Sequence, residues 1–448
     1  MWKKPVLELV APVTCAIELR ADSKFTNEDW QRVLYDLKPF VVEIDLRGEE
    51  PVEHPQFLDV LQILDNFKIP VNIYSNGLWD NPGELFKSIR KFGHIVSFHI
   101  PVYGFKEATH ELIGGKGTYS KVIENIKSAV THNYDIHVDV PVGKFNLYEI
   151  EDMAESFNDM RVRYVNFKRF IGKVVSEITL SEEEQADVIY RVDNLIQEGW
   201  PVAMGGCFPL CFSSSFTLTC CPGGVSFCVI DSNGDVKPCT DTGYVAGNVL
   251  KKPIKDIWKS PQMRKWRDNV AAECRKCDLY YALSCFGGCK CFAEKVNASR
   301  DPLIKEPVKI EPSPLMKEIN VEEELCPLPR YKKREEKFGC ILIHNHKFLP
   351  VKKEAEAILN AIDGETSLRT LDNKFGHAAI AFVYDLYLRK FLVFRHQDIP
   401  LLTRMLRSTS QRGGSPGAQA GAGGPGGMPP GASSDSPAPV EWDMRQRQ

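Results

Sequence analysis

The chain has 448 residues, with 43% hydrophobic and 26% charged residues, which is the balance of a globular protein with room for about three domains. Its formal net charge of −3 lacks the basic excess typical of nucleic-acid binding, and no apolar run has the roughly 18 residues that a membrane span needs. Glu8 and Pro12 interrupt the apolar N-terminal segment, so no secretory signal is expected. These features predict a cytoplasmic protein with no nucleic-acid or membrane partner.

The first half of the chain alternates short β-branched runs with amphipathic segments. Strands are predicted at 40–46, 70–77, 94–102, 135–142 and 161–171, with one more between residues 6 and 20. The last amphipathic segment begins with Ser181 and has Glu184 three residues later, which is a capping-box signature. Strands that alternate with helices indicate βαβ units and a parallel sheet. Residues 1–204 are therefore expected to form an α/β domain of about six repeats, as an open sheet or a partial barrel.

Residues 205–300 differ from the rest in their cysteine content. The chain has 14 cysteines, and 11 of them lie between Cys207 and Cys291. In a chain without a secretory signal, such a cluster more often holds metal than forms disulfides. A hairpin that turns at Asn233 and Gly234 is predicted within this region.

The C-terminal part of the chain contains three kinds of segment. Six prolines between residues 301 and 330 predict an extended linker over 301–327. Residues 328–400 have the pattern of a compact unit, with a hairpin at ILIHNHKFLPV followed by three helices. Residues 408–448 are rich in Gly, Pro and Ser with little apolar bulk, which predicts disorder.

The spacing of the cysteines is the strongest functional signal. Cys221 is followed by twelve residues, Gly234, four residues and Cys239. A second run has the spacing C-x2-C-x7-C-x3-C and comprises Cys274, Cys277, Cys285 and Cys289, with Cys291 close behind. Thiolates at such spacing bind iron–sulfur clusters or tetrahedral zinc. Chance spacing of buried cysteines would rarely give such pairs.

This pattern resembles the SPASM domain, the auxiliary-cluster module of peptide-modifying radical SAM enzymes. The resemblance implies one or two iron–sulfur clusters of the [4Fe–4S] type. Carried over by motif, the first cluster would use Cys221, Cys239 and Cys289, with one of Cys207, Cys211 or Cys220. The second cluster would use Cys274, Cys277 and Cys285.

Two departures from the SPASM pattern concern the second cluster. The third gap has seven residues where the family has five, and the family's last ligand closely follows an Asp-Pro pair. Here Asp301-Pro302 is followed by Leu303 and Ile304. Cys291 or Cys326 would then be the last ligand, and a three-thiolate or zinc-filled site remains open.

The first domain resembles a radical SAM partial (βα)6 barrel that lacks its cluster motif. In VTCAIELRADS, Leu19 and Asp22 stand where C-x3-C-x2-C would continue from Cys15, and neither is a suitable iron ligand. In RGEEPVEHPQF, which resembles the family's GGEP region, Glu49 would place a carboxylate where the amine of SAM meets bare backbone. We therefore expect no SAM binding. Cys15 also fits a core position in a buried strand.

Residues 328–394 resemble the PqqD-like leader-recognition domain, a small winged-helix unit. Together the resemblances imply a GeoRSP-like SPASM companion with a fused leader binder, which is not an autonomous radical SAM enzyme. It would bind the leader of a precursor peptide and support a complete partner radical SAM enzyme by electron transfer or substrate positioning. Two alternatives remain: an active radical SAM enzyme with an unorthodox cluster site, in which Cys207 and Cys211 take part, and a zinc-stabilised, non-redox peptide-binding scaffold.

Overall fold

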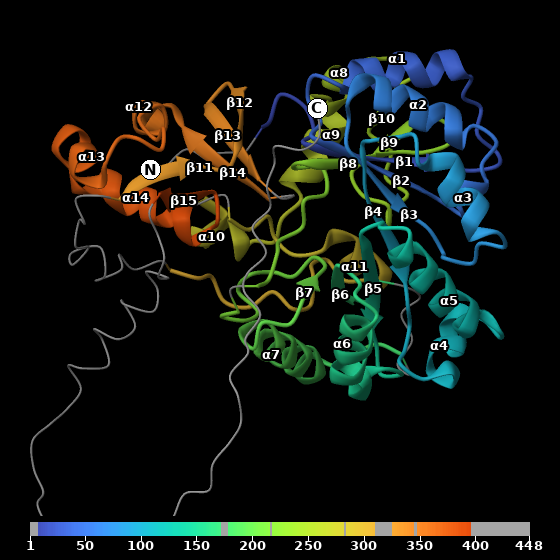
Figure 1. Ribbon diagram of the computed structural model, residues 1–448. Helices are drawn as coiled ribbons and strands as arrows, with labels where there is room; N and C mark the ends of the chain where they lie inside the picture. Colours follow the sequence, from blue (N-terminus) through green and yellow to red (C-terminus); the bar gives the residue numbers. More distant parts are fainter. Residues whose placement is uncertain are drawn as a thin grey trace, which may run out of the picture.

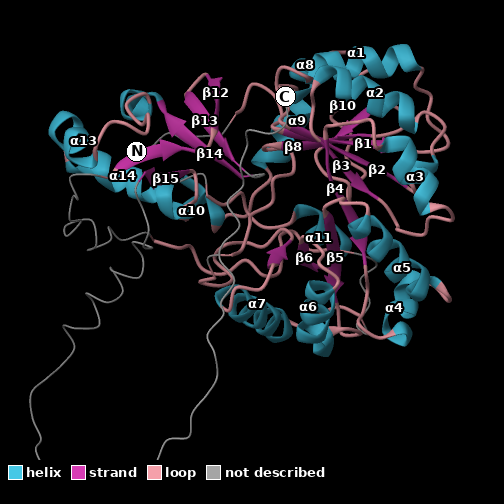
Figure 2. Cartoon of the chain, viewed as in Figure 1, coloured by secondary structure: helices cyan, strands magenta, loops and turns pink. Residues whose placement is uncertain are grey.

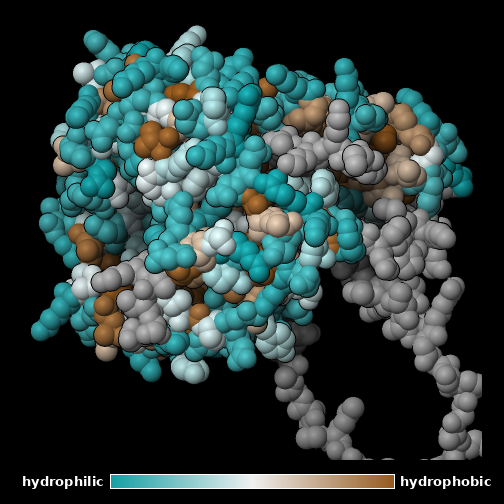
Figure 3. Space-filling view, turned by 180° about the vertical axis from the view of Figure 1, so that it is seen from behind, coloured by the Kyte–Doolittle hydropathy of each residue, from teal (hydrophilic) through white to brown (hydrophobic). Residues whose placement is uncertain are grey.

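The computed structural model describes residues 8–171, 178–215, 217–281, 284–309, 325–344 and 347–395 (Figure 1). The predicted tail at 408–448 and much of the predicted linker, 310–324, lie outside the described residues. Within the described residues, no helix combines the length and hydrophobicity needed to cross a bilayer. The face seen in Figure 3 is mostly hydrophilic, and its apolar residues form small separate groups. The described residues visible on that face therefore form no large apolar patch.

The main body is built on one ten-stranded sheet with the strand order β10-β9-β8-β1-β2-β3-β4-β5-β6-β7. Strands β1 to β7 run parallel in chain order, β8 joins the free side of β1 in parallel, and β9 and β10 continue antiparallel. The strands are β1 Thr14–Leu19, β2 Glu43–Gly48, β3 Val71–Tyr74, β4 Ile95–Pro101, β5 Ile136–Val142, β6 Tyr164–Arg169, β7 Val202–Gly205, β8 Phe227–Ile230, β9 Asp235–Lys237 and β10 Gly247–Asn248.

Helices α1 to α7 connect strands β1 to β7 and cover one face of the sheet (Figure 2), and α8 to α11 follow β10 in the cysteine-rich region. They are α1 Asn27–Leu37, α2 Phe57–Phe67, α3 Pro82–Ile89, α4 Glu107–Gly114, α5 Thr118–Thr131, α6 Ile150–Asp159, α7 Glu182–Gln197, α8 Ile254–Trp258, α9 Pro261–Asp268, α10 Asp278–Tyr281 and α11 Lys290–Lys295. The predicted capping box is confirmed, because Ser181 and Glu184 exchange side-chain and backbone hydrogen bonds at the start of α7. The predicted hairpin is also confirmed: β8 and β9 pair antiparallel, and Gly234 in the turn has φ +82°.

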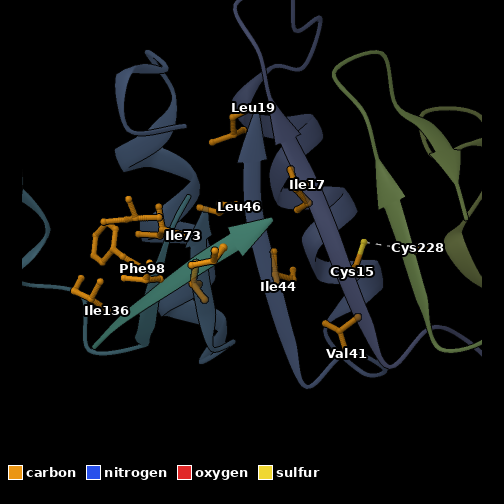
Figure 4. Close-up of a cluster of buried hydrophobic side chains, with 14 of the residues drawn as sticks. Cys15, Ile17, Leu19, Val41, Ile44, Leu46, Ile73, Phe98, Ile136 and Cys228 are labelled. Carbon is orange, nitrogen blue, oxygen red and sulfur yellow. Dashed lines mark hydrogen bonds between the residues drawn. The ribbon is translucent and has the colours of Figure 1, made fainter. Parts of the chain in front are cut away.

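The two faces of the sheet have opposite character because successive strand residues point to opposite sides. Figure 4 shows the helix-covered face, where Ile44, Leu46, Ile73 and Phe98 form part of the main core. The alternate positions of the same strands are polar, and they are Asp45, Arg47, Asn72, Tyr74, Ser97, His99, His137, Asp139, Asn166 and Lys168. A parallel sheet is usually apolar on both faces, so this polar face is a departure that needs a reason.

The sheet is larger than the six repeats that the sequence predicted. Strand β7 has only four residues and precedes Gly206, so its pattern is too short to stand out. Strand β8 belongs to the cysteine-rich region, and it pairs with β1 over Thr14 to Ile17. The cysteine-rich region therefore extends the main sheet directly.

Residues 325–395 form a second unit with a core of its own. Its strands are β11 Cys326–Pro329, β12 Lys332–Glu336, β13 Gly339–His344, β14 Lys347–Lys352 and β15 Leu392–Arg395, and its helices are α12 Glu356–Leu359, α13 Leu368–Phe375 and α14 His377–Leu388. Strands β12, β13 and β14 make an antiparallel sheet, and β11 pairs with β15. The predicted hairpin and three helices are confirmed.

Arg334 of the second unit binds the segment at the start of the main sheet, beside an apolar cluster in which Leu9 and Val13 pack with Ile341 and Ile343. Arg334 donates hydrogen bonds to the backbone oxygens of Ala11, Pro12 and Phe40, at 3.0, 2.9 and 2.6 Å. Glu336 pairs with this guanidinium at 2.7 Å, and its other oxygen accepts from the backbone N–H of Val10 at 2.7 Å. Because the Glu336 side chain is fully buried, this contact fixes β12 against the segment that leads into β1.

Candidate metal centre

Five cysteines meet where the cysteine-rich loops cross, and we call them the first thiol group. Its members are Cys207 in the loop after β7, Cys221 before β8, Cys239 after β9, and Cys289 and Cys291 at the start of α11. Thiol–thiol hydrogen bonds link Cys207 to Cys221 and Cys289, and link Cys291 to Cys239 and Cys289. The group therefore forms a continuous chain of neighbouring sulfurs.

The first thiol group contains two sulfurs whose pKa values are lowered by neighbouring thiols. Hydrogen bonds donated by the thiols of Cys207 and Cys291 lower the pKa of Cys289 to about 3. A hydrogen bond from Cys291 also lowers the pKa of Cys239, whereas the pKa of Cys291 itself is raised by these bonds. The backbone N–H of Phe292 donates to the Cys289 sulfur at 3.3 Å. Because thiolate is the form that binds metal, a lowered pKa favours metal binding at Cys239 and Cys289.

Asp301 holds the backbone of Cys289 in place. Its carboxylate accepts hydrogen bonds from the backbone N–H of Cys289 at 2.8 Å and of Leu303 at 3.1 Å. The same carboxylate forms a buried bidentate pair with Arg169, which ends β6. Sequence reasoning missed both residues as part of this site, because 132 positions separate them and no local motif joins them.

Four further cysteines, the second thiol group, surround a small cavity of about 10 Å3. They are Cys211, Cys274, Cys277 and Cys285. Burial raises the pKa of Cys274 to about 12, and the nearby sulfurs of Cys285, Cys211 and Cys277 add to this shift. The four cysteines thus line one small cavity.

The structure divides the outer cysteines between the groups in a way that differs from the motif-based grouping. Of the three candidates for the first group, Cys207 is hydrogen-bonded there, whereas Cys211 lies in the second group. Cys291, considered for the second group, lies in the first. Cys326, the other candidate, donates to the backbone oxygen of Glu365 at 3.2 Å in the second unit. Cys211 therefore lies in the second thiol group and Cys291 in the first, opposite to the groups for which the motif made them candidates.

Both thiol groups fit the ligand chemistry of iron–sulfur clusters. All nine donors are soft sulfurs, and most of them are buried. Among the described residues, no three His, Cys, Asp or Glu side chains lie close enough together to form a single-ion site. Cysteines that bind an iron–sulfur cluster are bound to separate irons, and N–H groups directed at the sulfurs stabilise the cluster, as the Phe292–Cys289 contact would.

The cysteine of the first strand belongs to the core. Cys15 lies inside β1 with no exposed surface, and its sulfur is 3.7 Å from that of Cys228 on β8 (Figure 4). Leu19 ends the same strand and is also buried, whereas Asp22 is exposed beside Arg20 at 3.6 Å. The interpretation of Cys15 as a core residue is confirmed, and the three positions of the degenerate motif do not meet.

The Gly-Glu-Glu segment closes the ends of β1 and β2. Gly48 has φ +152°, and a Cβ there would lie 2.0 Å from the backbone oxygen of Leu19. The buried Glu50 carboxylate accepts from the backbone N–H of Asn76 at 2.7 Å and the hydroxyl of Ser75 at 3.0 Å. Glu49 is largely exposed and pairs with Arg20 at 3.0 Å. This segment therefore fixes strand ends through glycine geometry and a buried acceptor.

The polar face of the sheet is occupied by its own side chains. The Arg47 guanidinium lies 3.4 Å from the centre of the Tyr74 ring, which stacks on His99 at 4.3 Å. Asp139 pairs with Lys168 at 2.5 Å and lies 3.5 Å from His99. Burial alone would raise the pKa of Asp139, but Lys168 and then His99 hold it well below its usual value. Ion pairs and ring contacts thus join several side chains of the polar face, whereas Arg47 Nε and His99 Nδ1 have no hydrogen-bond partner among the described residues.

Comparison with known proteins agrees with this architecture. Residues 17–157 match the radical SAM superfamily, and residues 220–278 match the SPASM iron–sulfur cluster-binding domain. The chain contains a radical SAM domain and a SPASM domain. The radical SAM match covers β1 to β5, and the SPASM match includes members of both thiol groups.

Characterised relatives resemble this pair of domains over most of their own length. The AdoMet-dependent heme synthase of Methanosarcina barkeri is 24% identical, over 60% of this chain and 82% of that protein. The mycofactocin maturase MftC of Mycobacterium ulcerans is 25% identical, over 60% of this chain and 76% of that protein. The crystal structure of Streptococcus suis SuiB bound to precursor peptide SuiA shares the fold, with a TM-score of 0.55 and 17% identity over 66% of this chain and 77% of that chain.

Proposed function

We propose that this chain is an accessory iron–sulfur protein of ribosomal peptide modification that acts in the cytoplasm. It binds the leader of a precursor peptide and supports a complete radical SAM enzyme by electron transfer or substrate positioning. One observation carries this proposal: nine sulfurs meet in two groups in and beside the SPASM domain, whereas the cysteine of the first strand is sealed in the core against Cys228.

The geometry around β1 supports a radical SAM domain that does not use SAM. Radical SAM chemistry needs three thiolates on one cluster, and among the described residues the cysteine in contact with Cys15 is Cys228. Arg20 pairs with Glu49 and Asp22 at the strand end, where all three side chains are satisfied by one another. On the polar face, the Arg47 guanidinium lies against the Tyr74 ring.

In the SPASM domain, the residues of this chain would bind and protect the clusters. The first thiol group would hold one cluster and the second group another, and such clusters store and pass single electrons. Asp301 positions the backbone of Cys289, and the buried rings of Phe292 and Trp266 keep water from the sulfurs. Because reduction potential depends on burial and N–H···S hydrogen bonds, these residues would tune the clusters as well as hold them.

The second unit is the proposed site of leader binding. Its three-stranded sheet has β12 and β14 as outer strands, and an extended peptide can add to such an edge through main-chain hydrogen bonds. SuiB, whose fold the main body shares, has been crystallised with its precursor peptide. The resemblance of residues 328–394 to PqqD-like leader binders supports this proposed role for the second unit.

The deciding experiment is anaerobic purification of the full chain, followed by counts of iron, acid-labile sulfide and zinc. We expect iron and sulfide in equal amounts with a broad visible absorbance, and no 5′-deoxyadenosine from SAM under strong reductant. Zinc without visible absorbance would establish the zinc scaffold instead. Reductive cleavage of SAM by the isolated chain would establish an active radical SAM enzyme.

The partner role is tested by a search of the neighbouring genes for a complete radical SAM enzyme and a small precursor peptide, followed by reconstitution with those two components. We expect peptide modification to need this chain, and a labelled leader to bind it with a measurable change in fluorescence anisotropy. Full modification in its absence would contradict the accessory role.

A further inference from the structure

The SPASM resemblance leaves the second thiol group one ligand short on its downstream side. The family's last cysteine closely follows an Asp-Pro pair, and this chain has Leu303 and Ile304 after Asp301-Pro302. In the structure, Ile304 and Lys305 line the same cavity as the second thiol group. The residues that follow Asp301-Pro302, where the family has its last cysteine, therefore line this cavity.

Cys211, which precedes the other cysteines of this group in the sequence, contacts the same residues of the cavity. It lies in the loop that follows β7, upstream of the matched SPASM segment. Its sulfur accepts a hydrogen bond from the backbone N–H of Lys305 at 3.3 Å. It lines the cavity together with Cys274, Cys277 and Cys285. The segment without a ligand thus contacts a cysteine that the family pattern does not require.

We infer that Cys211 is the fourth ligand of the second SPASM cluster and replaces the missing downstream cysteine. This inference rests on the proposed function, which requires that the SPASM domain hold clusters. On binding, the Cys211 thiol loses its proton to solvent and its sulfur bonds to one iron, with no change in electron count. The N–H of Lys305 then donates to a bound thiolate, as N–H groups do at iron–sulfur sites.

The rival ligands are held elsewhere. Cys326 bonds to Glu365 in the second unit, and Cys291 belongs to the first thiol group. Because Cys207 binds in the first group and Cys211 in the second, the five-residue segment 207–211 joins both sites. Four residue steps span at most roughly 14 Å, so this segment limits how far apart the two clusters lie.

The test compares Cys211→Ala with the matched control Cys326→Ala in the anaerobically reconstituted full chain. Two cubane clusters give about eight irons per wild-type chain. We expect Cys211→Ala to lose up to half of the iron and sulfide, or to show the EPR signal of a three-iron cluster when oxidised. Cys326→Ala should match the wild type in both measurements, and far-UV circular dichroism checks that each variant is folded.

A double variant identifies the group to which Cys211 belongs. Cys211→Ala combined with Cys277→Ala should lose no more iron than Cys277→Ala alone, because both changes affect one cluster.

Adding Ile304→Cys to Cys211→Ala should restore iron, because residue 304 lines the same cavity. If Cys211→Ala keeps all its iron with the wild-type EPR spectrum, or the double variant loses both clusters, the inference is wrong while the proposed function stands. A wild-type chain that takes up no iron overturns both.

Discussion

Arg169, the last residue of β6, forms a buried bidentate ion pair with Asp301, which lies 132 residues later. The two nitrogen–oxygen distances are 2.7 and 3.0 Å, and the exposed fractions of the side chains are 3% and 0%. The guanidinium also lies 3.8 Å from the centre of the Phe292 ring. Because Asp301 binds the N–H of Cys289, this pair connects the parallel sheet to the first thiol group.

Asp301→Asn should destabilise the protein and weaken the first thiol group. The substitution leaves a buried guanidinium without its counter-charge, which costs about 3–5 kcal/mol. Urea unfolding should show a lower midpoint, and the reconstituted variant should release iron faster than the wild type. The control is Asp385→Asn, which removes the exposed partner of Arg389 and should change stability by about 0.5 kcal/mol or less. Equal stability of the two variants would contradict the role of this pair.

Cys15→Ala should leave the iron content unchanged. Its sulfur contacts Cys228 in the core, so its removal creates a small cavity that costs roughly 1–2 kcal/mol. Thermal unfolding should move to a lower temperature, while iron, sulfide and the visible spectrum match the wild type. Cys221→Ala is the opposite control, because it removes a member of the first thiol group. Loss of iron from Cys15→Ala at unchanged stability would mean that Cys15 is a ligand.

Gly48→Ala should severely impair folding. The new Cβ would meet the backbone oxygen of Leu19 at 2.0 Å, and the φ of +152° is strained for any L side chain. We expect a loss of roughly 3 kcal/mol or more, measured as the yield of soluble protein and the urea midpoint. Gly83→Ala in α3 is the control, because a Cβ there has no atom within 4 Å. It should be neutral or slightly stabilising, and similar yields of both variants would count against the close approach of β1 and β2.

His110 should make stability depend on pH below neutrality. Burial lowers its pKa from 6.5, against a smaller opposite effect of Glu111, and its Nδ1 accepts from the backbone N–H of Tyr103 at 3.2 Å. As pH falls through about 6.5, the unfolded chain binds a proton that the folded chain does not, so the free energy of unfolding decreases. The urea midpoint should therefore fall between about pH 7.5 and 5.5.

The matching variants for this pH effect are His110→Asn and His132→Gln. In His110→Asn the amide oxygen can replace Nδ1 without titrating, so the midpoint should depend less on pH. His132→Gln changes an exposed ring and should keep the wild-type profile. An equally steep profile in His110→Asn would assign the pH dependence to other groups.

Much of the α/β architecture could be predicted from the pattern of the strands. In β5, for example, apolar residues that face the helices alternate with residues that lie on the polar face. The helix α7 was visible from Ser181 and Glu184, whose capping box is local in sequence. Strand β7 was missed because four residues before Gly206 carry too little pattern. The pairing of β8 with β1 joins residues about 210 positions apart, and no local signal reveals such a contact.

The sequence indicated which cysteines form the candidate site, but it indicated only partly which thiol group each cysteine joins. Cysteine spacing selected the residues, but spacing gives no direction for the side chains. Cys207 and Cys211 are four positions apart and still point into different groups, because the loop after β7 passes between them. No sequence spacing indicates the pair of Arg169 and Asp301, because the two residues are 132 positions apart and meet only in the folded chain.

The hydrogen bonds of Arg334 to Ala11, Pro12 and Phe40 have a consequence for any peptide that joins the second unit. The anchored sheet cannot swing freely, so a strand added to it starts at a constant offset from the thiol groups. The second unit would then fix the distance between the bound segment of the peptide and the thiol groups. The number of residues between the recognised segment and the presented segment would be nearly constant, and inserted residues in between would shift which side chain is presented.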